Sequence, residues 1–240
     1  MNITYSSIIE KLGKEFGTAG PYCYYAILSH LSTYFNNSVI VDLGTHRGES
    51  AAALAYNKSN KVYTYDISHS EEAADIFKKE EFQNIKYILG NCIEDNWSGM
   101  AMLEGVLPKT DKEIFLSSEL IFMDIDPHTG VQEDKVLNFL ISNNWKGILV
   151  CDDIGAEWID EFRAAEYTTL PIREWWDSID LPKFNIINNY SSPTGTGIIC
   201  FDNSILSNTL RSIVGTREIM ETLPLIISST TFSLLKLFST

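Results

Sequence analysis

The sequence predicts an α/β fold in which a doubly wound, mostly parallel sheet carries helices on both faces and ends in an antiparallel hairpin. Three observations support this prediction. From residue 39 onward, short apolar runs alternate with helical segments, which indicates right-handed strand–helix–strand crossovers. Several of the runs are continuously apolar, as strands buried on both faces are. Late in the chain, two strand-like runs lie too close together for a crossover helix, so we expect them to pair antiparallel.

The first expected strand, Val39 to Leu43, is a β-branched run suited to the interior of a parallel sheet. The alanine-rich segment from Glu49 to Tyr56 follows as a helix that can pack closely on it. Strands and helices then alternate: strand Lys61–Tyr65, helix Glu71–Lys79, strand Ile85–Leu89, a loop-and-helix region over residues 94–112, strand Leu120–Met123, helix Gln132–Ser142 and strand Ile148–Cys151.

Helical periodicity from Ile3 to Phe35 precedes this pattern, and the runs Phe184–Ile187 and Gly197–Phe201 form the expected hairpin. We therefore expect one compact unit with three parts: an N-terminal helical cap over residues 1–38, a sheet domain over residues 39–202 and a C-terminal helical extension over residues 203–240. The apolar stretch from Ile226 to Phe238 is long enough to bury itself against a second copy, which would make a homodimer.

Composition restricts the partners. The 240 residues include 18 basic and 32 acidic ones, giving a net charge of -14, which argues against nucleic acid or an anionic membrane as the main partner. The four cysteines are widely spaced and show no metal-binding pattern, as expected of reduced thiols. We see no signal-peptide pattern at the start and no apolar run of membrane-spanning length. These features predict a cytoplasmic protein.

The most informative motif is Asp42-Leu-Gly-Thr-His-Arg-Gly48, a glycine-punctuated turn after the first strand. Just over twenty residues later, the second strand ends in Asp66. Glycines at such a turn let a ligand approach the backbone, and an acid at the end of the next strand can accept both hydroxyls of a ribose. The pair predicts a site for a nucleoside-containing cofactor. The alternative is that the glycines only form a tight turn and Asp66 caps the following helix.

The turn also indicates which nucleoside. A dinucleotide fingerprint is G-x-G-x-x-G, and here His46 stands at its second glycine, where a side chain obstructs a pyrophosphate. Asp42 is poorly placed beside phosphates but suits a ligand that carries an ammonium group. Both features favour S-adenosylmethionine, which has a sulfonium and an amino acid end and no phosphate.

With these motifs, the sequence resembles the class I S-adenosylmethionine-dependent methyltransferases between about Val39 and Asp202. Their acidic and glycine motif matches Asp42 to Gly48, their ribose-binding acid matches Asp66, and Gly90-Asn91-Cys92 approximates their adenine-side motif. The resemblance implies a Rossmann-like, seven-stranded sheet and an S-adenosylmethionine-dependent enzyme. The cofactor contacts that we predict are Asp42, Gly44, Thr45, His46, Gly48, Ser50, Asp66, Ile67, Asn91, Cys92 and Asp124.

Carboxylates cluster after two further strands. Asp124 and Asp126 follow the fourth expected strand, and Asp152 and Asp153 follow the fifth. Because the carboxyl ends of parallel strands face one crevice, these acids should converge beside the methyl donor. They would repel one another without a cation, and hard oxygen ligands suit Mg²⁺ or another divalent cation.

The cluster resembles the site of metal-dependent O-methyltransferases of the catechol type and of the type that acts on sugar hydroxyls of natural products. The matching ligand positions are Asp124, Asp152 and Asp153. The resemblance implies methyl transfer to a hydroxyl of a small-molecule acceptor. Catechol-type enzymes carry a lysine base where this chain has Pro127, so we predict His128 as the catalytic base beside Asp124.

Other interpretations stay open at this point. Asp124 and the Asp152–Asp153 pair could cap helices, and His128 could simply be exposed. The enzyme could be a metal-independent class I methyltransferase directed at nitrogen or oxygen. The chain could also be a non-catalytic adenosine-binding protein of the same fold.

Overall fold

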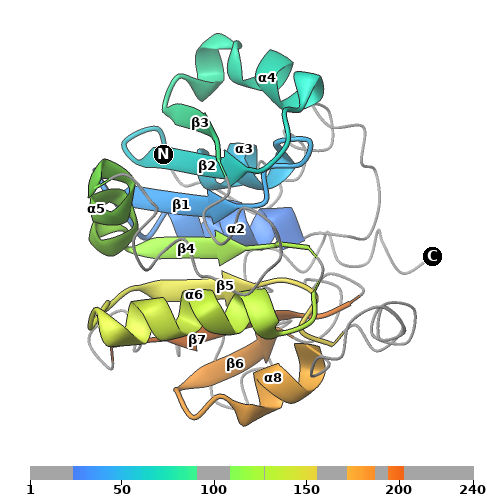
Figure 1. The fold of residues 1–240 in the computed structure, drawn as a ribbon. Helices are drawn as coiled ribbons and strands as arrows, with labels where there is room; N and C mark the ends of the chain where they lie inside the picture. Colours follow the sequence, from blue (N-terminus) through green and yellow to red (C-terminus); the bar gives the residue numbers. More distant parts are fainter. Residues whose placement is uncertain (1–23, 91–108, 127, 156–171, 187–193, 203–240) are drawn as a thin grey trace, which may run out of the picture.

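The computed structural model describes residues 24–90, 109–126, 128–155, 172–186 and 194–202 (Figure 1). The expected first helix, the C-terminal extension, and the predicted cofactor contacts Asn91 and Cys92 lie outside these residues. The described elements are α2 (Tyr24–Ser32), β1 (Val39–Leu43), α3 (Glu49–Leu54), β2 (Lys61–Asp66), α4 (Glu71–Phe77), the 3-10 turn η1 (Glu80–Phe82), β3 (Ile85–Leu89), α5 (Lys109–Ser117), β4 (Leu120–Met123), α6 (Val131–Ser142), β5 (Ile148–Cys151), α8 (Ile172–Ser178), β6 (Lys183–Ile186) and β7 (Thr196–Cys200).

The seven strands form one sheet in the order β3-β2-β1-β4-β5-β7-β6. β1 pairs with β2 and β4 in parallel, and the parallel pairing continues to β3 on one side and β5 on the other. β7 inserts between β5 and β6 and runs antiparallel to both. The predicted doubly wound sheet with a terminal antiparallel hairpin is confirmed. The strand order reverses between β1 and β4, which is where open α/β sheets bind ligands.

One face of the sheet is covered by α2 and α3. Ile40, Phe122 and Val150 are strand residues whose side chains point to this face. Leu28 and Leu31 of α2 and the buried alanines of α3 pack against them, and all of these side chains are essentially inaccessible to solvent. The small alanine side chains let α3 approach β1 closely. As a result, the turn that precedes α3 is held directly above the carboxyl end of β1.

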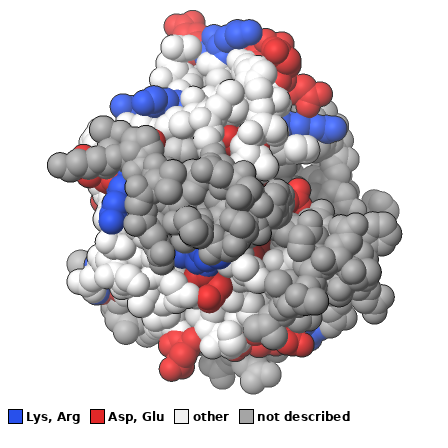
Figure 2. Space-filling view, in the orientation of Figure 1, with Lys and Arg blue, Asp and Glu red and all other residues white. Residues whose placement is uncertain are grey.

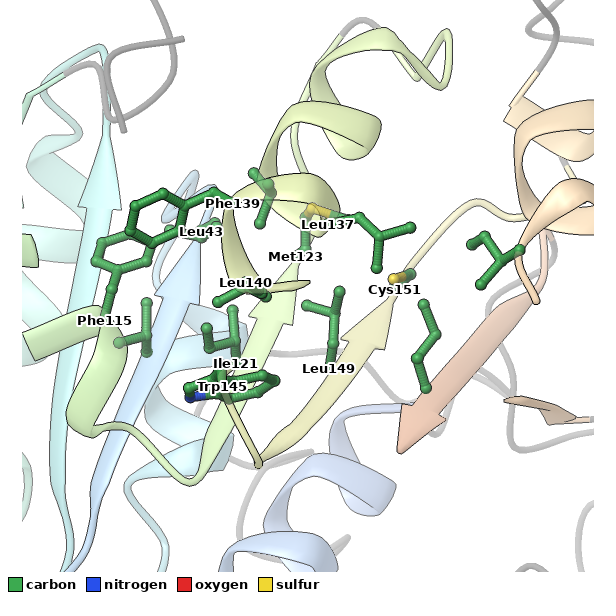
Figure 3. Close-up of a cluster of buried hydrophobic side chains, with 14 of the residues drawn as sticks. Leu43, Phe115, Ile121, Met123, Leu137, Phe139, Leu140, Trp145, Leu149 and Cys151 are labelled. Carbon is green, nitrogen blue, oxygen red and sulfur yellow. The ribbon is translucent and has the colours of Figure 1, made fainter. Parts of the chain in front are cut away.

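The opposite face is covered by α5, α6 and α8. Figure 3 shows Leu137 and Leu140 of α6 directed toward Ile121, Met123 and Leu149 of the sheet. Trp145 closes the lower end of this layer, and its indole N–H donates to the Ser118 carbonyl at 2.7 Å. None of the described helices combines the length and hydropathy that crossing a membrane requires.

Trp176 joins α8 to the hairpin. It is 2 % exposed, and its Nε1–H donates to Asn185 Oδ1 of β6 at 2.7 Å. The ring packs over Gly197 of β7, where an added Cβ would lie 2.3 Å from it. The absence of a side chain at residue 197 is therefore what allows the tryptophan to lie flat on the last strand.

We expect Trp176→Ala to lower the free energy of unfolding by about 3–5 kcal/mol, because it leaves a cavity the size of an indole between α8 and β7. Trp176→Phe keeps much of the apolar contact and should lose less. Urea denaturation followed by circular dichroism measures both. Equal stability of the alanine variant and the native protein would contradict this account of the packing.

Candidate functional site

A cavity of about 610 Å³ opens at the carboxyl ends of the parallel strands. Its walls come from the segments that follow β1, β2 and β4. Of the predicted site residues, the cavity is lined by Gly44, Thr45, His46, Ser50, Asp66, Ile67, Asp124 and His128. Gly48, Asp42, Asp152 and Asp153 do not line it. The structure thus places most residues of the two predicted motifs on the wall of one cavity.

Gly44 forms the floor of this cavity. Its φ is 94°, in the left-handed region, and an added Cβ would lie 1.8 Å from the backbone oxygen of Asp124. The amides of Gly44 and Thr45 both donate to the Tyr65 carbonyl, at 2.9 and 3.2 Å. Glycine is required here because the end of β4 occupies the space of a side chain. The turn is thereby fixed to β2 and β4 together.

Asp66 is anchored at one wall of the cavity. Its Oδ2 accepts the His46 amide at 2.8 Å, and its Oδ1 accepts the amide and hydroxyl of Ser68 at 2.9 and 3.1 Å. The carboxylate is held by the loops after β1 and β2, while it remains partly accessible from the cavity. The neighbouring Ile67 is 64 % exposed and presents an apolar surface beside it.

Asp42, a predicted cofactor contact, is fully buried beneath the turn. Its Oδ2 accepts the Thr64 hydroxyl at 2.5 Å, and Thr64 in turn contacts the Thr45 hydroxyl at 2.6 Å. Burial raises the pKa of Asp42 to about 7, although the hydrogen bond from Thr64 acts to lower it. In this structure Asp42 supports the turn from below.

An acidic cluster surrounds His128 at the other wall. The imidazole Nε2 lies 3.1 Å from Asp153 Oδ2, 3.6 Å from Asp126 Oδ1 and 3.8 Å from Asp124 Oδ1. Burial, reinforced by the charges of Asp152 and Asp153, raises the pKa of Asp124 well above its usual range. His128 and Asp153 both have left-handed backbones, with φ of 54° and 60°. Such conformations are unfavourable for non-glycine residues and concentrate at functional sites.

Three of these side chains could hold a metal ion. One ligand atom each from Asp124, His128 and Asp153 lies within 4.8 Å of the others. Asp152, the third predicted ligand, instead accepts a hydrogen bond from the Thr196 hydroxyl at 2.9 Å and is 6 % exposed. Asp153 also accepts a hydrogen bond from the Thr194 hydroxyl. The structure therefore gathers His128 with two of the three predicted ligands.

Sequence reasoning missed Glu133, in the first turn of α6. Its side chain is 2 % exposed, and no described side chain donates a hydrogen bond to either carboxylate oxygen. Burial raises the pKa of Glu133 to about 8, although the backbone amides of Glu133 and Gly130, at the start of α6, act to lower it. The signal was present in the sequence, because Glu133 shares the helical spacing of Val136, Leu137 and Leu140, which form the apolar face of α6. An acid in that row is unexpected in a merely structural helix.

Comparison with solved structures assigns the fold. A protein from Staphylococcus aureus assigned as a caffeoyl-CoA O-methyltransferase superposes with a TM-score of 0.52 at 15% identity, over 83% of this chain and 92% of that one. The chain shares the Rossmann-like fold of the class I methyltransferases. No protein-family model and no curated protein sequence matches it.

Two other structures with this class I methyltransferase fold superpose less well. The O-methyltransferase TomG from Streptomyces achromogenes, involved in tomaymycin synthesis and solved with S-adenosylmethionine, has a TM-score of 0.48 at 12% identity, covering 83% of this chain and 90% of that one. An RNA methyltransferase from Salinibacter ruber, solved with S-adenosyl-L-homocysteine, has a TM-score of 0.45 at 11% identity, covering 75% and 92%. The superposition on the Staphylococcus aureus protein shows the fold alone, so the acceptor has to be argued from the site.

The buried Asp42 makes a prediction about pH. Its pKa is 3.8 in the unfolded chain and about 7 when folded, so between these values folding takes up a proton. Stability therefore falls as pH rises through this window, by up to about 1.4 kcal/mol per pH unit. We expect Asp42→Asn to remove this contribution, so that the slope of the unfolding free energy against pH between about pH 4 and 7 becomes more positive by up to that amount. Urea denaturation at several pH values measures the slope, and parallel curves for the two proteins would contradict the assignment.

Proposed function

We propose that this protein is an S-adenosylmethionine-dependent methyltransferase that acts on a hydroxyl group of a small molecule with the help of a divalent cation. One observation carries the proposal. The anchored carboxylate of Asp66 and the acids Asp124 and Asp126 beside His128 line the same cavity. A nucleoside held by Asp66 and an acceptor held by the acidic cluster would therefore share one cavity.

The described residues fit the cofactor. Asp66 is held by three hydrogen bonds from the protein, so its remaining lone pairs are directed for ribose hydroxyls. Ile67 offers an apolar contact for the adenine ring. Gly44 and Thr45 line the cavity with the turn along which the methionine end would pass. A cavity of about 610 Å³ is within the usual range for a ligand of this size.

The residues also fit a divalent cation. Asp124 and Asp153 supply carboxylate oxygens and His128 supplies an imidazole nitrogen, a donor set that suits Mg²⁺, Mn²⁺ or Zn²⁺. The pKa of Asp124 is raised partly by neighbouring carboxylates, and a cation would compensate that repulsion. When bound, such an ion lowers the pKa of a coordinated hydroxyl and so makes it a better nucleophile.

The charges around the cavity favour a small acceptor over a nucleic acid. Asp66, Asp124 and Asp126 line it together with Glu49 and Glu72. Arg47, the basic residue at its rim, is paired with Glu72 at 3.2 Å. On the face shown in Figure 2, the basic side chains of the described residues are scattered and form no continuous patch. A polyanion would be repelled here, whereas a neutral hydroxyl compound would not.

A second candidate is metal-independent methyl transfer with His128 as the base. The 3.1 Å contact between Nε2 and Asp153 Oδ2 favours it, because a carboxylate beside an imidazole stabilises the imidazolium formed when the base takes a proton. The two candidates use the same nitrogen for different purposes. Metal binding therefore decides between them.

Calorimetry with S-adenosylmethionine and S-adenosylhomocysteine tests the cofactor site. We expect the native protein to bind both and Asp66→Asn to bind about 10- to 100-fold more weakly, since hydrogen bonds to a charged group are lost. Asp75→Asn, which removes an exposed acid of α4 on the outer surface, serves as the control. If the native protein bound neither compound, the methyltransferase proposal would fail.

Binding of Mn²⁺, measured by electron paramagnetic resonance, tests the metal site without knowledge of the acceptor. We expect saturable binding to the native protein and a loss of at least about 10-fold in affinity for Asp124→Asn and Asp153→Asn, because each loses a charged ligand. Asp180→Asn, which changes an exposed acid beyond α8, is the matched control. A native protein that bound no Mn²⁺ would eliminate the metal-assisted reaction in favour of His128 as the base.

A further inference from the structure

We propose that Glu133 is a positioning residue that accepts a hydrogen bond from the Nδ1–H of His128 and so directs the other ring nitrogen, Nε2, to the acids of the cavity. The inference rests on the proposed function only in that His128 takes part in the chemistry. It holds equally whether Nε2 binds a cation or accepts a proton.

The two nitrogens of His128 face different acids. Nε2 lies 3.1 Å from Asp153 Oδ2 and 3.8 Å from Asp124 Oδ1, at the cavity. Nδ1 lies 3.9 Å from Glu133 Oε1, in the first turn of α6. Glu133 does not line the cavity, whereas Asp124 and His128 do. The imidazole thus lies between Asp124 and Asp153 on its Nε2 side and the buried Glu133 on its Nδ1 side.

Glu133 is placed where an acid is unfavourable for stability. It is 2 % exposed, and no described side chain donates a hydrogen bond to either of its oxygens. Figure 3 shows Leu137, one turn further along α6, pointing toward the sheet. A leucine at residue 133 would continue that apolar row. The Glu133 and Gly130 backbone amides offset the cost of burying this carboxylate only in part, since its pKa stays raised. Its presence therefore indicates a role other than packing.

His128 can supply a hydrogen-bond donor to the Glu133 carboxylate. The ring is 8 % exposed, and a distance of 3.9 Å is within ion-pair range. Closing it to a hydrogen bond requires a shift of about 1 Å. Once Nδ1 carries the proton that Glu133 accepts, the neutral ring has its lone pair on Nε2. A carboxylate behind a histidine in this way fixes the tautomer and raises the basicity of the opposite nitrogen.

A simpler explanation is that Glu133 complements the dipole at the start of α6, where acids are favoured. Asp134, the next residue, supplies the same charge in the same turn. Its carboxylate is exposed and accepts hydrogen bonds from Asn138 at 2.7 Å and Trp175 at 3.2 Å. The helix dipole therefore explains an acid at residue 134 and does not require a second, buried one. Asp134→Asn is the matched control for the experiments on Glu133.

Nitrogen-15 NMR of histidine-labelled protein locates the proton directly. At about pH 8.5, two units above the usual pKa of histidine, we expect Nδ1 of His128 to be protonated in the native protein, with or without added metal. Glu133→Leu should remove that proton from Nδ1, Glu133→Gln should keep it through the amide carbonyl, and Asp134→Asn should leave it in place. The ring-nitrogen signals of His128 are those that disappear in His128→Gln. An unprotonated Nδ1 in the native protein, or the same signature in Glu133→Leu, would overturn the inference.

Mn²⁺ affinity and stability, measured on the same variants, separate a positioning role from a structural one. We expect Glu133→Leu to bind Mn²⁺ about 10- to 100-fold more weakly while unfolding at an equal or higher urea concentration. Unchanged affinity combined with lower stability would show a structural role and overturn the inference. If leucine prevents folding, Glu133→Met offers a more adaptable side chain for the same comparison.

The two proposals can fail separately. If the native protein bound no Mn²⁺ but Glu133→Leu lost the Nδ1 proton, the metal-assisted reaction would fall and the positioning role would stand. If Mn²⁺ bound at Asp124 and Asp153 while the Nδ1 signal did not respond to replacement of Glu133, the metal site would stand and the positioning role of Glu133 would be rejected.

Discussion

The close approach between Gly44 and the Asp124 carbonyl sets the geometry of the whole cavity. The backbone of β4 lies where a side chain at residue 44 would be, so the turn after β1 and the acid after β4 are placed by one contact. The Gly44 and Thr45 amides extend this constraint to β2 through the Tyr65 carbonyl. Three neighbouring strand ends are therefore held together by backbone groups, which leaves the Asp66 and Asp124 side chains available to a ligand.

The acids of this region work against the stability of the folded chain. Asp42 and Glu133 are fully buried, with pKa values raised by burial to about 7 and 8. Asp124 repels the acids around it. An apolar or amide side chain at these positions would avoid desolvating a charge. Functional sites commonly retain such local conflicts, because they create a strong field where the ligand binds.

The sequence was sufficient for the sheet. Buried parallel strands have a distinctive apolar pattern, and the ends of β1 and β2 follow directly from it. The structure places Gly44 and Asp66, the residues predicted at those two ends, at the cavity. The direction of each acid after a strand was harder to predict. Asp152 and Asp153 are adjacent in sequence, yet the hydroxyl of Thr196, from a strand far along the chain, binds the first. A left-handed backbone turns the second toward His128. Neither effect is visible in local sequence pattern.

The two walls of the cavity also differ in how they are built. The wall around Asp66 consists of turns whose backbone amides donate to the Tyr65 carbonyl and to the Asp66 carboxylate, with the Asp42 and Thr64 side chains beneath them. The wall around His128 is formed largely by side chains: Asp124, Asp126 and His128 come from the segment between β4 and α6, and Glu133 lies behind them in the first turn of α6. Replacing side chains in that segment would change the charge and the proton-accepting groups at the cavity without replacing Gly44 or Asp66. Under the proposed function, the fold could keep one cofactor site while the acceptor chemistry varies, and acceptor specificity would reside in the β4–α6 connection.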